Sequence, residues 1–297
     1  MAACPSISLV ASLANRVKAM RRRYRKRLKH CQRKFSKSAV HDLRVETRRL
    51  LAMFDVLRVL RLPGPLGKMR KVFKQRLDAF DELRDTHVQL SLLRPLCRQF
   101  PGAREPHALL CQRERWLTDE LRQGVHEALK AHLERRLKTL EKNLRKSTAK
   151  MPSAAARLAI LVALREAFDR VVALRRRIRP NRAATIHRTR VAFKSFRYMC
   201  EWLRPYLPGL KAEELGRMRE YQAMMGTIQD LEVLLAAVRG AVTDKEISGR
   251  AVGPLRRELL RRRRERIDIY LAAADRLFEF KPDVLAAQAS RPRTDQL

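Results

Sequence analysis

The sequence predicts an all-α protein built from two similar halves. Leu, Ala, Arg, Lys and Glu dominate its 297 residues, and apolar residues recur at spacings of three and four, the period of an amphipathic helix. Alternating runs of β-branched and polar residues, which indicate strands, are few. Two sequence blocks occur twice in the same order, which indicates a duplicated helical unit.

Proline and glycine divide the chain into about eight helical segments. The surest breaks are Pro63-Gly64-Pro65, Pro101-Gly102, Pro152, Pro180, Pro205 to Gly209 and Gly253-Pro254. The expected helices cover residues 7–35, 39–61, 66–98, 106–149, 153–179, 183–204, 211–239 and 254–280. We expect residues 281–297 to form a flexible tail.

The repeated blocks define the domain organisation. VHDLRVETRRL at 40–50 is answered by IHRTRVAFKSF at 186–196, and ELRDTHVQLSLL at 82–93 by TIQDLEVLLAAV at 227–238. The alignment pairs His41 with His187, Arg44 with Arg190, Arg48 with Lys194, and Asp85 with Asp230. Because both blocks repeat at nearly one offset, we expect one pseudo-symmetric body over residues 1–280. Its two four-helix halves cover about 1–150 and 151–280.

The charge indicates a polyanionic partner. The chain has 67 Lys and Arg residues against 31 Asp and Glu, a net charge of +36. A folded surface with that charge repels itself unless a polyanion shares it. Charge alone does not choose among DNA, RNA, anionic lipid and polyphosphate.

Cysteine usage and hydropathy indicate a cytoplasmic protein without a membrane span. The five cysteines are scattered and form no close pair, so we interpret them as reduced thiols. No segment reaches the roughly 18 apolar residues that a spanning helix needs. The acid-free residues 1–40 also fit a transit peptide, but a helical pattern from Arg16 to Lys29 favours a folded segment.

A basic row borders the apolar face of each His-bearing helix. On a helical projection His41, Arg44 and Arg48 fall within about 60° of one another, and the acids Asp42 and Glu46 lie beyond the apolar stripe. The second copy repeats the row with His187, Arg190, Lys194 and Arg197. Such a row can also extend into solvent or pair with acids of a neighbouring helix, for which Asp85 and Asp230 are candidates. Its repetition, each time beginning with a histidine, favours binding.

The same residues carry a family resemblance. V-H-x-x-R-V-x-x-R-R-L followed by L-R-D-x-x-V resembles the CHAD family, the conserved histidine α-helical domain. I-H-x-x-R-V-x-x-K-x-x-R-Y followed by M-G-x-I-Q-D-L-E-V resembles that family's second repeat, so the resemblance covers roughly residues 10–280. It implies two four-helix bundles about a pseudo-twofold axis, with a basic central channel that binds polyphosphate.

Carried over position by position, the resemblance implies a set of polyphosphate-binding residues. These are His41, Arg44, Arg48 and Arg49 in the first repeat and His187, Arg190, Lys194 and Arg197 in the second, with Lys74 and Arg219 added from the third helix of each half. The first repeat departs from the pattern because Leu51 stands where the second has Arg197. We therefore expect unequal binding by the two halves. Asp85 and Asp230 are interpreted as structural hydrogen-bonding residues.

The leading hypothesis is a non-catalytic protein that binds inorganic polyphosphate through Lys, Arg and His, without a cofactor. Non-specific DNA or RNA binding through the excess basic surface is the alternative, although aromatic residues are only 6% and no nucleic-acid motif is found. An enzyme acting on triphosphate or polyphosphate is a third hypothesis. The E-x-E-x-K signature and a glycine-rich phosphate loop are missing from the sequence, and the histidines have no partner ligands for a metal. Localisation is expected to be cytoplasmic, with polyphosphate granules as a candidate site of association.

Overall fold

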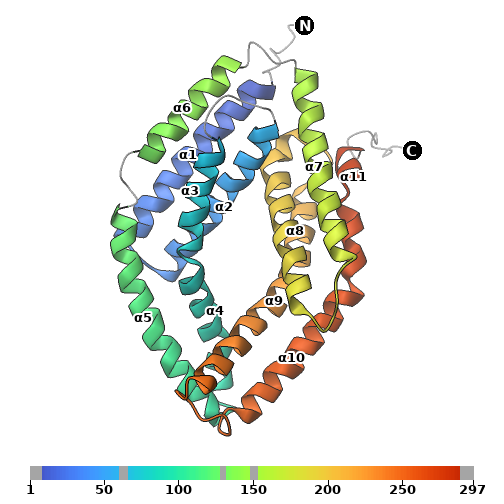
Figure 1. Cartoon of the computed structure of the whole chain (residues 1–297). Helices are drawn as coiled ribbons and strands as arrows, with labels where there is room; N and C mark the ends of the chain where they lie inside the picture. The colour runs from blue at the N-terminus through green and yellow to red at the C-terminus, as the bar shows by residue number, and fades with distance from the viewer. Residues whose placement is uncertain (1–8, 60–65, 128–131, 148–152, 288–297) are drawn as a thin grey trace, which may run out of the picture. The chain divides into compact units, whose positions relative to one another are not determined.

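The computed structural model describes residues 9–59, 66–127, 132–147 and 153–287, and every regular element in these ranges is a helix (Figure 1). The main helices are α1 (Leu9–Arg33), α2 (Lys37–Val59), α3 (Leu66–Asp78), α4 (Asp81–Leu96), α5 (Arg104–Glu127), α6 (His132–Ser147), α7 (Ser153–Arg175), α8 (Ala183–Leu203), α9 (Ala212–Thr243) and α10 (Gly253–Ala272). Shorter turns are η1 (Pro101–Ala103), η2 (Arg204–Tyr206), η3 (Ala274–Phe280) and α11 (Pro282–Ala287). The predicted all-α class is confirmed.

The chain divides into two compact units. Unit 1 comprises Met1–Glu82 and Leu117–Leu164, and unit 2 comprises Leu83–Trp116 and Arg165–Leu297. Helices α5 and α7 therefore contribute one end to each unit. This division follows spatial compactness, whereas the duplication follows the sequence. The halves at 1–150 and 151–280 stay a prediction.

Unit 1 has a core built from the apolar faces of α1, α2, α3 and α6. Helix α1 packs on α2 and α6, and α2 packs on α3. The aromatic rings of Tyr24, Phe54 and Phe73 meet in this core, where the Phe73 ring lies 5.2 Å from Tyr24 and 5.6 Å from Phe54. This packing fixes the orientation of α2, which carries the first basic row.

Unit 2 contains an aromatic core around the second basic row. Phe193 of α8 packs edge-on against Tyr221 of α9 with 4.8 Å between ring centroids, and Phe280 of η3 covers both. The buried Tyr221 hydroxyl donates to the carbonyl oxygen of Ala274 at 3.0 Å. Helices α8 and α9 are thereby held against each other along the face that carries His187.

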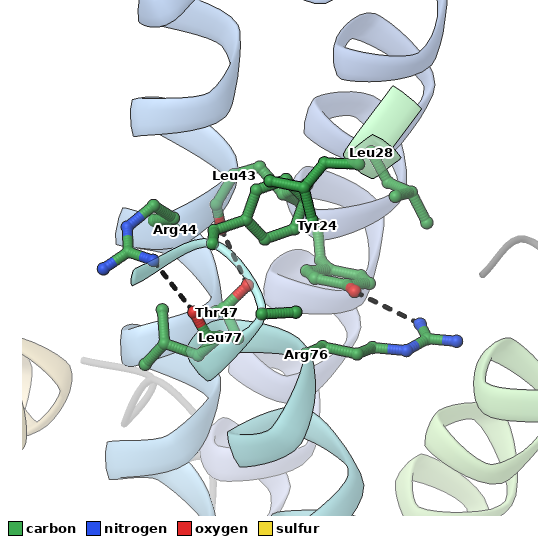
Figure 2. Close-up of a pocket in the computed structure, with 10 residues that line it drawn as sticks. Tyr24, Leu28, Leu43, Arg44, Thr47, Arg76 and Leu77 are labelled. Atoms are coloured by element: carbon green, nitrogen blue, oxygen red, sulfur yellow. Dashed lines mark hydrogen bonds between the residues drawn. The ribbon is translucent and has the colours of Figure 1, made fainter. Parts of the chain in front are cut away.

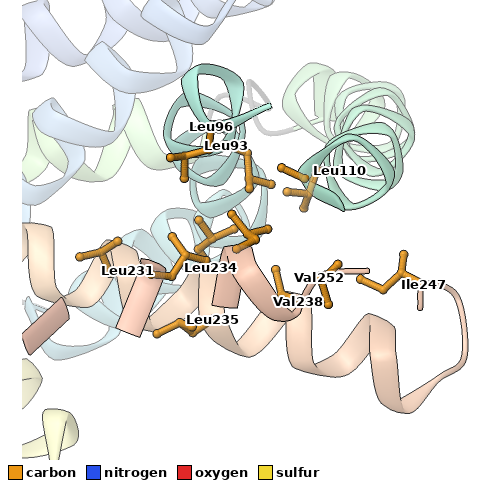
Figure 3. Close-up of a cluster of buried hydrophobic side chains, with 12 residues drawn as sticks. Leu93, Leu96, Leu110, Leu231, Leu234, Leu235, Val238, Ile247 and Val252 are labelled. Carbon is orange, nitrogen blue, oxygen red and sulfur yellow. The ribbon is translucent and has the colours of Figure 1, made fainter. Parts of the chain in front are cut away.

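A second apolar cluster of unit 2 joins α4, α5, α9 and α10 (Figure 3). Leu93 and Leu96 of α4 lie against the α9 residues Leu231 and Leu234, all of them buried. At its edge Gly102 approaches the main chain of Ala251 so closely that a Cβ at position 102 would lie 2.0 Å from the Ala251 oxygen. Only glycine fits this contact, which sets the turn between α4 and α5.

One expected helix is interrupted, and another covers two of the described helices. The segment expected as one helix over 66–98 forms α3 and α4 with a break at residues 79 and 80. Arg44 of α2 bridges the break. Its Nη1 donates to the carbonyl oxygen of Leu77 at 2.8 Å (Figure 2), and its Nη2 pairs with Asp81 at 2.5 Å. Asp81 and Glu82 also place acids in the first turn of α4, which the helix dipole favours.

The segment expected as one helix over 106–149 contains α5 and α6, and the residues between them, 128–131, lie outside the described ranges. The expected flexible tail starts with a helix, because residues 282–287 form α11. Leu285 is buried there and Asp283 pairs with Arg165 of α7, so this part of the tail is anchored to unit 2. Residues 288–297 of the expected tail lie outside the described ranges.

Candidate functional site

The first basic row lies on α2 in unit 1. His41 is exposed, and Arg48 and Arg49 are half-buried. Arg49 Nη1 pairs with Glu46 at 3.2 Å, and Glu46 also accepts from Arg23 of α1 at 3.0 Å. Arg49 lies outside the row of His41, Arg44 and Arg48, and its charge is neutralised in part by the buried Glu46.

Arg44 has a different environment from its neighbours on α2. Its side chain is 2% exposed, and its guanidinium donates to the Leu77 carbonyl and forms an ion pair with Asp81. It also lines a cavity of about 140 Å³ together with Tyr24, Leu43 and Leu77 (Figure 2). In this structure the Arg44 guanidinium is a structural bridge between α3 and α4.

The two residues predicted from the third helix of each half are both exposed. Lys74 on α3 pairs with Asp78 one turn along the same helix, and Arg219 lies on the exposed side of α9. Exposed pairs of this kind contribute little to stability, so the Lys74 ammonium can exchange its partner for another anion.

The second basic row lies on α8 in unit 2, where α9 covers part of it. His187 and Lys194 are half-buried. Burial lowers the pKa of His187 below its ordinary value, and the charges of Arg190 and Lys194 lower it further, against a hydrogen bond with Gln229 of α9. The imidazole is therefore neutral in the free protein near pH 7, and its buried Nδ1 has no hydrogen-bond partner among the described residues.

Arg190 lies over a small residue of α9. A Cβ at Gly226 would be 3.6 Å from Arg190 Nε, an ordinary van der Waals contact, so the guanidinium lies close to the α9 backbone at this position. Burial lowers the pKa of Arg190, and the nearby charge of Arg84 acts in the same direction, while Asp230 and Asp85 oppose both. The buried Nε has no hydrogen-bond partner among the described residues. Arg190 is thus a partly desolvated cation with an unused donor.

Arg197 ends the second row in a buried position. Its Nε donates to Gln222 at 2.9 Å, its Nη1 pairs with Glu201 at 3.2 Å, and its guanidinium stacks 4.2 Å from the Tyr198 ring. With 6% of its surface exposed, the Arg197 side chain braces α8 against α9.

Arg84 of α4 is a site residue that the sequence reasoning did not single out. Its Nη1 donates to Asp85 at 2.8 Å and its Nη2 pairs with Asp230 at 3.0 Å, which joins the aspartates of both repeated blocks. Burial acts to lower the pKa of Arg84, but the two carboxylates outweigh it and the net pKa is raised. Its place directly before Asp85 in the L-R-D block is the signal that could have identified it.

The two copies of the motif differ at their matching arginines. In the alignment that pairs Asp85 with Asp230, Asp81 pairs with Gly226. Arg44 therefore has a carboxylate partner where Arg190 has a glycine. Helix α9 also runs unbroken where α3 and α4 are interrupted, so it offers Arg190 no terminal carbonyl. The two matching arginines therefore differ in their partners, although the Nε of each has no hydrogen-bond partner among the described residues.

The described ranges provide neither a metal centre nor a membrane span. Within them no three His, Cys, Asp or Glu side chains gather as metal ligands, and no helix is long and apolar enough to cross a bilayer. Among the polar residues of the unit 2 site, the carboxylates of Asp85 and Asp230 are paired with Arg84. The site presents cationic and neutral donors to a ligand.

The chain is all-helical, and each copy of its repeated motif places His, Arg and Lys on one helix. These features are those of a helical protein with basic sites. The model of one family, the CHAD domain, matches residues 12–239. The chain belongs to the CHAD family, which confirms the resemblance inferred from its motifs. Its structure is similar to the crystal structure of the CHAD domain from the plant Ricinus communis, with a TM-score of 0.68 and 19% identity over 92% of this chain and 93% of that one. At this identity the similarity concerns the fold. No curated protein matches the sequence.

Proposed function

We propose that the protein binds inorganic polyphosphate without chemically altering it, and that the second basic row on α8 makes the strongest contacts. The observation that carries this proposal is the state of Arg190, which is half-buried, has an unused Nε donor and lacks the carboxylate partner that its counterpart Arg44 has. A desolvated cation gains more from an arriving phosphate than an exposed one does, because a charge-assisted hydrogen bond is stronger where water is excluded.

The neighbours of Arg190 suit a chain of phosphates. His187 and Lys194 lie one helical turn to either side of Arg190 on α8, so the three side chains follow a line along the helix. Successive phosphates of a linear polymer can meet successive donors of such a line, and no aromatic surface is needed because there is no base to stack. In unit 1, His41, Arg48, Arg49 and Lys74 are proposed as further contacts. Arg44 and Arg197 are proposed to act by positioning helices, and the exposed Arg219 to add to the attractive field.

Binding without catalysis is supported by how the carboxylates are used. Metal-assisted phosphoryl transfer needs carboxylates that are free to hold a divalent ion. Here Asp85 and Asp230 are paired with Arg84, which leaves cations as the dominant groups of the site. We therefore expect no release of phosphate when the protein is incubated with polyphosphate and Mg²⁺. We further propose a cytoplasmic location at polyphosphate granules.

Calorimetric titration with long-chain polyphosphate tests the proposal. Arg190→Gln should weaken binding roughly 10- to 100-fold, since a hydrogen bond to a charged group contributes about 1.5–3 kcal/mol. Arg188→Gln is the matched control, because Arg188 is an exposed arginine of the same helix and its loss removes the same charge. If both variants lose affinity equally, binding depends on net charge and the α8 site has no special part.

A further inference from the structure

A second strongly basic surface lies in unit 1, on a pair of helices outside the candidate site. Helices α1 and α6 pack side by side (Figure 1). Each helix has its buried apolar residues on one side. Two contacts show that the helices are antiparallel: Arg145 Nη2 donates to Asn15 Oδ1 at 2.9 Å, and Arg21 Nη2 donates to Glu141 Oε2 at 3.5 Å.

Each helix carries a row of exposed cations with the same spacing. The rows, here called the α1/α6 basic face, consist of Arg22, Arg25, Lys26, Lys29 and Arg33 on α1 and Arg135, Lys138, Lys142 and Arg145 on α6, all exposed. At about 100° per residue each row spans an arc of about 80–100° opposite the buried residues of its helix. Asn15 falls on the α1 row, so its bond to Arg145 joins the two rows on one side of the pair.

The α1/α6 basic face is poor in neutralising groups. Residues 9–33 contain no Asp or Glu at all. On α6 the buried carboxylate of Glu141 is bonded to Arg21 and also pairs at 3.6 Å with Arg145, at one end of the α6 row. A surface of one sign that extends over about 16 Å of two helices attracts an extended polyanion.

Among polyanions, the shape and composition of this face favour a nucleic-acid duplex as the partner. We propose that it binds the two phosphate backbones of double-stranded nucleic acid without reading the sequence. Packed helices lie about 8–10 Å apart, which is between the widths of the minor groove, about 6 Å, and of the major groove, about 12 Å. From two parallel rows at that separation, long and flexible Lys and Arg side chains can reach both phosphate rows beside a groove, whereas a single phosphate chain can follow one row only.

Two other partners are disfavoured by what the face lacks. Among the described side chains of α1 and α6, no large apolar residue is exposed that could insert between lipids. No exposed aromatic ring lies in the rows either, so the bases of a single strand find no stacking platform there. The partner is therefore bound through its phosphates alone, and its affinity should depend steeply on salt.

The test is the salt dependence of binding to a duplex DNA of about 20 base pairs, chosen to exceed the length of the rows. In the face variant Arg22→Gln, Lys29→Gln, Lys138→Gln and Lys142→Gln are combined. If all four contact phosphates, the slope of log K against log salt should fall in magnitude by about 3–4, since each phosphate contact contributes about 0.9. The matched control combines Arg256→Gln, Arg257→Gln, Arg264→Gln and Arg266→Gln, which removes the same charge from exposed positions on α10 and should change the slope by less than about 1.

Three outcomes would overturn this proposal. They are equal slope changes in both variants, equally tight binding of the single strand of the same sequence, and binding of anionic phospholipid vesicles in place of the duplex. Polyphosphate titration separates this surface from the proposed polyphosphate site: the face variant should keep its polyphosphate affinity, and Arg190→Gln should keep its duplex affinity. Unchanged melting curves exclude misfolding as the cause of a loss.

Discussion

Replacing the two matching arginines, Arg44 and Arg190, by methionine should separate stability from binding. Arg44→Met should mainly destabilise the fold, whereas Arg190→Met should mainly weaken polyphosphate binding. Arg44→Met removes the donor to the buried Leu77 carbonyl and the partner of Asp81. The Leu77 oxygen keeps its hydrogen bond from Phe80 N at 3.3 Å, so the loss is that of one buried hydrogen bond from a charged donor, about 1.5–3 kcal/mol. The ion pair adds little, about 0–1 kcal/mol, because the Asp81 side chain is 57% exposed and water screens it. We expect a total loss of about 1.5–4 kcal/mol in the free energy of unfolding.

Arg190→Met supplies the comparison within the same protein. Its Nε has no partner to lose, and Asp85 and Asp230 keep Arg84 as a partner, so the loss should stay below about 1 kcal/mol. Urea unfolding followed by far-ultraviolet circular dichroism measures both variants. Equal destabilisation by the two substitutions would refute the assignment of Arg44 to the fold and of Arg190 to the ligand.

Two further predictions concern packing and pH. Gly102→Ala should lower the free energy of unfolding, measured in urea, by at least about 2 kcal/mol, because the new Cβ meets the Ala251 backbone. Gly240→Ala is the control: nothing lies within 4 Å of its new Cβ, so it should stabilise α9 by about 0.5–1 kcal/mol. A mild effect at position 102 would contradict the close approach. Because the pKa of His187 is lowered in the folded state, its contribution to stability is complete above pH 6.5 and is lost as the pH falls through the folded-state pKa. Polyphosphate affinity should rise over the same pH range, because the imidazole gains a positive charge. His187→Gln should flatten both profiles, and an affinity that rises equally with acid in this variant would exclude the histidine as their source.

The sequence predicts the helices well because their apolar spacing and Pro-Gly breaks are local properties. The break between α3 and α4 could not be predicted in this way. No proline or glycine lies near residues 79 and 80, and the interruption is stabilised by Arg44, a residue distant in sequence. Tertiary contacts of this kind override local propensity.

The candidate site was predictable as a set of positions, but not as a set of environments. A helical projection places Arg44, Arg190 and Arg197 alike at the border of the apolar face. Their burial depends on the residue opposite each one: Asp81 for Arg44, Gly226 for Arg190, and Gln222 with Glu201 for Arg197. Those partners become visible only when α3, α4 and α9 are placed beside the basic rows.

A structure determined with bound polyphosphate would show directly whether Arg190 contacts the polymer. We predict phosphate oxygens within about 2.7–3.2 Å of Arg190 Nε, with density for the polymer continuing along α8 toward His187 and Lys194. Phosphates found only on the α1/α6 basic face or on α10, with Arg190 unchanged over Gly226, would contradict it.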